Sequence, residues 1–218
     1  MIITDIGHLS IRSAEREYVL RPTFQAMTRI GSPERIIEVM AAVFGSRYPQ
    51  HRILNAWIAR AAIARGYAET VSAAATIMQA CCDEDITPVI GEYRIQASGK
   101  LFMRAGRLPP NELVILARHL MTHGVLGDQP PVVGEGKGEY SPRFDARSWV
   151  YLAVAHLGVS ESEAWGMTMT GLRAALAAKY PQKEKPKIPT EEEYDEFMEM
   201  ADALMAADSA RTENLNAF

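Results

Sequence analysis

Apolar residues recur every three or four positions along most of this chain, a spacing that predicts amphipathic helices. The pattern covers residues 24–30, 33–44, 50–66, 70–82, 111–123 and 148–180. Near the start, Leu9 and Ile11 alternate with polar residues, a polar turn follows at 13–16, and Tyr18 and Leu20 alternate again. Such alternation on both sides of a turn predicts a short β-hairpin within residues 2–21. The expected fold is mainly α, a helical bundle-like body with a short N-terminal β-hairpin.

Several predicted helices have recognisable ends. Ser32 stands at an N-cap position, with Pro33 in the first helical position. Residues 148–180 divide into two helices joined by a short hinge, because Gly158 is suited to end the first helix in the left-handed conformation. Ser160 then caps the second helix, and Glu163 lies three residues further on, the spacing of a capping box.

The same periodicity assigns a buried face to each helix of the N-terminal body. The apolar residues expected on these faces are Phe24, Met27, Ile30, Ile36, Ile37, Met40, Val43, Ile53, Leu54, Trp57, Ile58, Ala61, Ile77, Met78, Leu113, Leu116, Ala117 and Leu120. Gly66 is expected to end the helix at 50–66.

Two segments lack a clear period. Glycines and a proline interrupt residues 86–108, which we interpret as irregular with a short helix around 89–94. Residues 124–144 are rich in glycine and proline and indicate a flexible connector. The expected organisation is a helical body with the hairpin at 1–124, a connector at 125–144, a C-terminal helix pair at 145–181, and a linker with a terminal helix at 182–218.

The tail after Pro181 predicts an acidic amphipathic helix behind a solvated linker. Thr190 and Glu193 have capping-box spacing, and acidic residues cover one face of the segment. The apolar face consists of Tyr194, Phe197, Met198, Ala201, Leu204 and Met205. Two interpretations stay open: the helix folds back on its own domain, or it docks in a groove on a partner.

Composition narrows the class of protein. The chain has 218 residues, 48% of them apolar, and a net charge of -4. No basic stripe that would follow a phosphate backbone is evident, which argues against nucleic-acid binding. The apolar runs are shorter than the roughly 18 residues that a membrane helix needs. The N-terminus does not resemble a signal peptide. The only cysteines, Cys81 and Cys82, are adjacent, so we expect no disulfide framework and a cytoplasmic location.

One pair of residues has metal-ligand spacing. His119 and His123 are four residues apart on a predicted helix, and Glu112 lies about two turns earlier on roughly the same side. In zinc proteases of the His-Glu-x-x-His type a glutamate directly follows the first histidine, whereas here Leu120 stands there. Cations near a helix C-terminus are also favourable in themselves, so the sequence favours a structural role for the pair over a metal site.

Other candidate chemistry has a simpler structural interpretation. The acidic run 83–85 fits an exposed turn better than a calcium loop, and the glycines at 134–138 lack the Lys-Ser/Thr pair of a phosphate loop. Cys81 and Cys82 lie in an alanine-rich segment, where small packing residues are common. We therefore predict no catalytic, cofactor or metal site, and a protein that is not an enzyme.

Three stretches carry a resemblance to a known class of protein. Residues 157–181 contain Leu-Gly, an acidic turn, an aromatic residue, Met-Thr and a leucine-rich helix, and the corresponding residues are Leu157, Gly158, Ala164, Trp165, Met167, Thr168, Leu172 and Leu176. Residues 113–127, and the start at Leu20, Pro22, Thr23, Phe24 and Met27, have similar counterparts. Together they resemble tail assembly chaperones of long-tailed bacteriophages and gene-transfer agents. Where such proteins often read Thr-Pro-x-Glu-Leu, residues 168–172 read Thr-Met-Thr-Gly-Leu.

The resemblance implies a non-enzymatic protein of the host cytoplasm. It would bind the tape-measure protein, aid tail tube assembly and cooperate with the major tail protein. The alternative is a structural tail or neck adaptor that stays in the virion, and homo-oligomerisation stays open. The candidate partner-binding residues are Trp149, Trp165, Met167, Leu172, Tyr194, Phe197, Met198 and Leu204.

Overall fold

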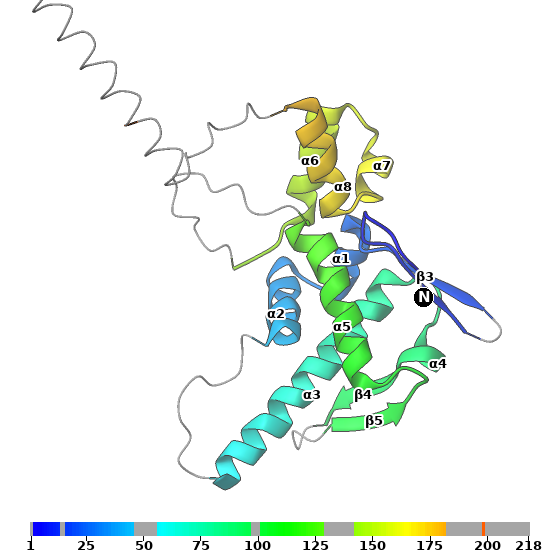
Figure 1. Ribbon diagram of the computed structural model, residues 1–218, viewed down its shortest axis with the longest axis vertical. Helices are drawn as coiled ribbons and strands as arrows, with labels where there is room; N and C mark the ends of the chain where they lie inside the picture. The colour runs from blue at the N-terminus through cyan, green and yellow to red at the C-terminus, as the bar shows by residue number, and fades with distance from the viewer. Residues whose placement is uncertain are drawn as a thin grey trace, which may run out of the picture. The chain divides into compact units, whose positions relative to one another are not determined.

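A computed structural model describes residues 2–13, 16–45, 56–96, 101–128, 142–181 and 198 (Figure 1). All of the named helices and strands belong to the unit Met1–Tyr180. The described part is mainly helical, with a small sheet at its start and a second hairpin in the middle, which confirms the predicted fold class.

The predicted N-terminal hairpin is present. Strand β2 (Leu9–Arg12) pairs antiparallel with β3 (Glu17–Leu20), with Leu9 opposite Leu20 and Ile11 opposite Tyr18. These four side chains are buried, so one face of the hairpin covers the core. A further strand, β1 (Ile2–Ile3), pairs with β2 and was not predicted, because two residues are too few to show alternation.

The first two helices follow their sequence signals. Helix α1 (Phe24–Ile30) begins where the Thr23 hydroxyl accepts a hydrogen bond from the Ala26 backbone N–H at 3.1 Å. Helix α2 (Pro33–Phe44) begins in the same way at Ser32 and ends at Gly45, whose φ of 78° is left-handed. Of the residues expected on the buried faces of these two helices, Ile37 and Met40 are only half-buried. The buried ones are Phe24, Met27, Ile30, Ile36 and Val43.

Helix α3 (Ala56–Cys81) corrects the prediction of two helices. Gly66 lies inside it, although glycine costs about 1 kcal/mol in a helix interior. The Thr70 hydroxyl donates to the carbonyls of Gly66 and Ala42, at 2.9 and 3.0 Å, which ties this turn to α2. The burial expected at Ile58 and Ala61 is wrong because both are exposed. Ile53 and Leu54 and the side chain of Trp57 lie outside the described residues.

Residues 86–108 are more ordered than we predicted. They form a short helix α4 (Thr87–Ile90) and an antiparallel hairpin of β4 (Gly91–Ile95) and β5 (Leu101–Ala105). Two glycines allow the base of the hairpin to close: a Cβ on Gly91 would lie 2.4 Å from the Arg104 carbonyl oxygen, and one on Gly106 would lie 2.3 Å from the Gly91 nitrogen. The glycines that suggested irregular structure are therefore needed for close backbone approach.

Helix α5 (Pro110–Met121) packs on α3 through the predicted face of Leu113, Leu116, Ala117 and Leu120, which are all buried. It continues as a π-helix, η1 (Thr122–Leu126). The predicted connector therefore begins later than residue 125, and residues 129–141 within it lie outside the described part.

The C-terminal helices number three in the described chain, in place of the predicted pair: α6 (Ala146–Leu157), α7 (Glu161–Trp165) and α8 (Met169–Lys179). Gly158 ends α6 with a φ of 73°, as predicted. The capping box of Ser160 and Glu163 is also present, but it opens only the short α7. Thr168 provides the separate N-cap of α8 by accepting from the Gly171 N–H at 3.0 Å.

One continuous cluster of buried residues joins these elements. It runs from the hairpin through α1, α3 and α5 to α6 and α8. Its fully buried large side chains include Leu9, Phe24, Ile77, Leu120 and Met169. Side chains far apart in sequence therefore share a single core, which positions the surfaces described next.

Candidate partner-binding surface

A cleft of about 390 Å³ lies where the α1–α2 junction faces the start of α6 and the end of α7. Its apolar lining includes Ile36, Phe144 and Trp165, and Asp145 and Arg147 add charge. The Phe144 backbone N–H donates to the Pro33 carbonyl at 2.9 Å, which fixes this chain segment to the start of α2. The cleft thus combines an aromatic wall with polar groups, as protein-binding grooves commonly do.

Trp165 is held in place from two directions. Its indole Nε1 donates to the Glu161 carboxylate at 3.2 Å, and its half-buried ring packs against the core cluster. Two residues later, the Met167 carbonyl accepts a hydrogen bond from the Phe24 N–H at 2.9 Å. This bond joins the α7–α8 turn to the first turn of α1. Trp165 is therefore presented from a rigid junction.

The other predicted partner-binding residues have different positions. Trp149 and Met167 are half-buried against the core, so each keeps some accessible surface. Leu172 is fully buried, and its assignment as a contact residue is wrong because it packs beneath the surface. Met198 is exposed. Tyr194, Phe197 and Leu204 lie outside the described residues.

The two histidines of the candidate metal pair do lie together. The ring centroids of His119 and His123 are 4.4 Å apart. His123 is buried, and its Nδ1 shares a hydrogen bond of 2.9 Å with the Thr170 hydroxyl of α8. The same hydroxyl accepts from the Asp128 N–H at 3.2 Å. The pair therefore sits at a hydrogen-bonded junction between η1 and α8.

The surroundings of His119 at this junction favour the neutral form of its imidazole. Burial lowers the pKa of His119, and the neighbouring His123 lowers it further. The His119 Nε2 is buried without a hydrogen-bond partner among the described residues. The backbone of Gly7 packs directly on the His123 ring, since a Cβ there would lie 2.3 Å from the His123 Cγ. The side chains of the two histidines are therefore closely packed by their neighbours.

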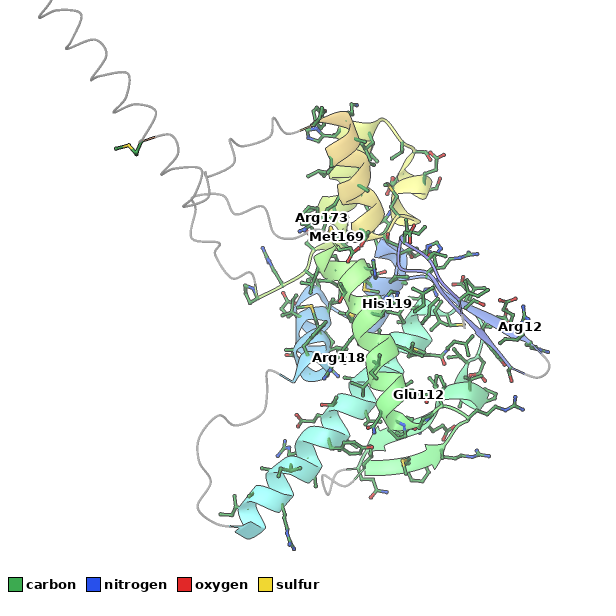
Figure 2. The ribbon with its side chains drawn as sticks, in the orientation of Figure 1. Arg12, Glu112, Arg118, His119, Met169 and Arg173 are labelled. Atoms are coloured by element: carbon green, nitrogen blue, oxygen red, sulfur yellow. The ribbon has the colours of Figure 1, made fainter. Side chains whose placement is uncertain are left out.

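Further ligands for a metal are not gathered around the pair. Figure 2 shows His119 near the end of α5 that approaches Met169 and Arg173 of α8, whereas Glu112 lies toward the other end of the helix. Within the described ranges, no group of three or more His, Cys, Asp or Glu residues is placed to hold a metal ion. What the structure shows of the pair is the bond of His123 to Thr170 and its close contact with Gly7.

The cysteines and the acidic run also have structural roles. Cys81 and Cys82 are both free and buried, and burial raises the pKa of each thiol, which disfavours the nucleophilic thiolate. Asp83 forms an ion pair of 2.7 Å with Arg29, and Asp85 accepts from the Thr87 N–H at 3.0 Å. These carboxylates close the turn between α3 and α4.

A second exposed apolar surface, on α3 and the β4–β5 hairpin, was not predicted from the sequence. Ile63, Tyr67, Ile95 and Met103 are all exposed there. The available signal was the continuation of the α3 stripe through Ile63 and Tyr67, which the expected helix end at Gly66 concealed.

Comparison with known proteins gives one family. The model described as "Family of unknown function (DUF6246)" matches residues 20–196. No curated protein and no solved structure matches the chain. Among the described residues, no helix combines the length and apolar character needed to cross a membrane.

Proposed function

The chain belongs to this family of unknown function, and we propose that it is a non-enzymatic tail assembly chaperone of a long-tailed bacteriophage. In this proposal it binds the tape-measure protein in the host cytoplasm, keeps it soluble, and helps the major tail protein assemble around it. The proposal starts from the sequence resemblance and takes its support from where the resembling stretches lie.

The observation that carries the proposal is the meeting of these stretches at one junction. Phe24, in the first stretch, donates its backbone N–H to the Met167 carbonyl in the last. Gly124, in the middle stretch, lies so close to Met27 that a Cβ would be 2.9 Å from its sulfur. The bond between His123 and Thr170 joins the middle stretch to the last. Three stretches that are separate in the sequence thus build one structural unit, as a shared function would require.

The cleft beside Trp165 suits transient binding of an apolar segment. Tryptophan is a frequent anchor of protein interfaces because it buries a large area and loses little conformational entropy. Here Trp165 is only half-buried and its indole N–H is already satisfied by Glu161, so a partner can cover the ring without leaving that donor unpaired. A single anchor in a cleft of this size favours modest affinity, which a chaperone needs in order to release its client.

Co-expression with the tape-measure protein from the same gene neighbourhood tests the proposal. We expect the full chain to raise the soluble fraction of the tape measure and to co-purify with it. Trp165→Ala should lose both effects. Tyr151→Ala is the matched control, because Tyr151 is an exposed aromatic residue on α6 that does not line the cleft. Thermal melts followed by circular dichroism show that both variants are folded.

Two results would contradict the proposal. Failure of the full chain to solubilise or bind the tape measure removes the chaperone function. Detection of the chain in purified virions at a fixed stoichiometry, together with that failure, would establish the structural tail or neck adaptor in its place.

A further inference from the structure

The core-facing stripe of α3 continues beyond the part of the helix that other elements cover. Ile63, Tyr67, Val71, Ala74 and Met78 follow one another at intervals of three or four residues and so share one helix face. Val71, Ala74 and Met78 are fully buried, whereas Tyr67 is 42% exposed and Ile63 is 62% exposed. Figure 1 shows the first turns of α3 extending past the other helices. The same apolar face is therefore packed at one end and bare at the other.

The β4–β5 hairpin extends this bare face. Met103 lies directly opposite Tyr93 in the hairpin register, and Ile95 is two residues from Tyr93, so all three point to one side of the hairpin. Tyr93 is buried, but Met103 is 52% and Ile95 is 43% exposed. Burial and the nearby Tyr67 both raise the pKa of Tyr93, which places the two tyrosines close together. We define the α3 patch as Ile63, Tyr67, Ile95 and Met103.

An unsatisfied polar atom lies beside the α3 patch. The Tyr93 hydroxyl is buried and has no hydrogen-bond partner in the described part of the chain. A buried polar group without a partner is unfavourable, because it has lost its hydrogen bonds to water. A partner that covers the patch and offers a hydrogen-bonding side chain would remove that cost, so this atom is a second indication of a binding surface.

The charge at this end of α3 specifies the kind of partner. In the described part of α3 before Glu69, the charged residues are Arg60 and Arg65, and both are basic. The whole chain carries a net charge of -4, so this end of α3 opposes the overall sign. Arg60 lies seven residues before Tyr67, on the same face of α3. A second copy of the chain would bring like charges together, whereas an acidic partner would meet complementary ones.

We propose that the α3 patch binds an amphipathic helix of a partner protein whose apolar stripe is flanked by carboxylates. Ile63 and Tyr67 are one turn apart, so they form a ridge against which a second helix can pack. That helix would extend the packing that α5 already makes further along α3. The flanking carboxylates would lie near Arg60, and a polar side chain would reach the Tyr93 hydroxyl. This inference does not depend on the partner being a tape-measure protein.

A binding titration with a defined probe tests the proposal. The probe is a fluorescein-labelled Leu/Ala peptide of about 20 residues, long enough to form a helix, with glutamates flanking its apolar stripe. An identical peptide with lysines in place of the glutamates controls for charge. Fluorescence anisotropy with the full chain should show binding of the glutamate peptide, and the lysine peptide should bind at least roughly tenfold more weakly.

Matched variants locate the binding surface. Ile63→Glu and Met103→Glu should weaken binding by roughly tenfold or more, as loss of an interface anchor does. Ile115→Glu should leave binding unchanged, because Ile115 is also 62% exposed but lies on the exposed face of α5, outside the patch. Arg60→Gln should weaken binding more than Arg65→Gln, since Arg65 lies on the opposite side of α3 and pairs with Glu69 at 3.1 Å.

Several outcomes would overturn the proposal. Equal binding of the two peptides would refute the charge preference. Equal loss of peptide binding in Ile115→Glu and Ile63→Glu would refute the assignment of binding to the α3 patch. A stable dimer in light scattering that Ile63→Glu dissociates assigns the patch to a second copy. Binding that is seen only after Glu191, Glu192 and Glu193 are replaced by Gln assigns it to acidic residues of the chain itself. Each of these results leaves the co-expression test of the chaperone function unaffected.

Discussion

Thr170 joins two parts of the fold that meet only in three dimensions, and its removal has a calculable cost. Its hydroxyl accepts a hydrogen bond from the Asp128 N–H at 3.2 Å and shares one of 2.9 Å with Nδ1 of the buried His123. Thr170→Val keeps the side-chain shape but removes both interactions. The imidazole of the buried His123 then loses this partner, whereas the amide of Asp128 belongs to an exposed residue and can bond to water.

The expected loss of unfolding free energy is about 1–3 kcal/mol, which is the cost of leaving one buried polar group, the His123 imidazole, unpaired. Urea unfolding followed by circular dichroism measures this loss. Thr76→Val is the control: its hydroxyl donates to the Ser72 carbonyl at 3.0 Å, but Thr76 is exposed, so water replaces the bond and the loss should stay below about 0.5 kcal/mol.

Amide hydrogen exchange gives a second, local measurement. Exchange at Asp128 should accelerate in Thr170→Val more than exchange in the core of α3, because the lost bond is local to the junction. The reasoning is refuted if Thr170→Val and Thr76→Val lose equal stability, or if the Asp128 amide exchanges at the same rate in the variant and the natural protein.

Two further predictions concern acid sensitivity and backbone packing. The fold lowers the pKa of His119 below its ordinary value of 6.5. Its contribution to the unfolding free energy should therefore be present above about pH 6.5 and be lost as the pH falls toward the folded-state pKa, because the unfolded chain then binds more protons. His119→Gln should reduce this dependence in urea titrations at several pH values, and an unchanged slope would contradict the assignment. Gly91→Ala should lose at least about 2 kcal/mol, since φ is 84° and the new Cβ would lie 2.4 Å from the Arg104 carbonyl oxygen. Gly158→Ala meets nothing within 4 Å and should lose less; equal losses would show that backbone crowding at Gly91 is unimportant.

Local signals predicted the elements whose stability comes from neighbours in the sequence. The buried face that Leu9 and Ile11 share with Tyr18 and Leu20 follows from the alternation along the two strands. The caps at Ser32 and Ser160 follow from hydroxyls placed three residues before the N–H they bind. In each case the interacting groups are close along the chain, so the pattern contains the whole interaction.

Prediction was wrong where distant parts of the chain outweigh a local preference. Gly66 was expected to end a helix, but the Thr70 hydroxyl bonds to Ala42 and the packing of α3 carries the helix through it. The glycines at 91 and 106 suggested irregular structure, yet they permit the β4–β5 hairpin to close. In both places the intrinsic conformational preference of glycine is weak, and tertiary packing decides which secondary structure forms.

The candidate binding surfaces also separate into residues that the sequence identified and residues whose exposure depends on tertiary packing. Trp165 was placed among the candidate partner contacts from the sequence, as part of the C-terminal helix pair. Leu172 was predicted with it, although the fold buries this side chain completely. The exposure of Ile63 and Tyr67 could not be read from the α3 stripe, since residues of identical pattern are fully buried further along the same helix.

The amino-acid sequence by itself determined the helical class, the N-terminal hairpin and most helix ends of the described chain, because periodicity and capping are properties of adjacent residues. Only the tertiary structure decided which members of an apolar stripe stay uncovered, and that Phe24 meets Met167 at one junction. The physical reason is that burial depends on what packs against a face. That packing is set by other elements of the fold, such as α5 for α3 and Met167 for Phe24, and no local pattern contains them.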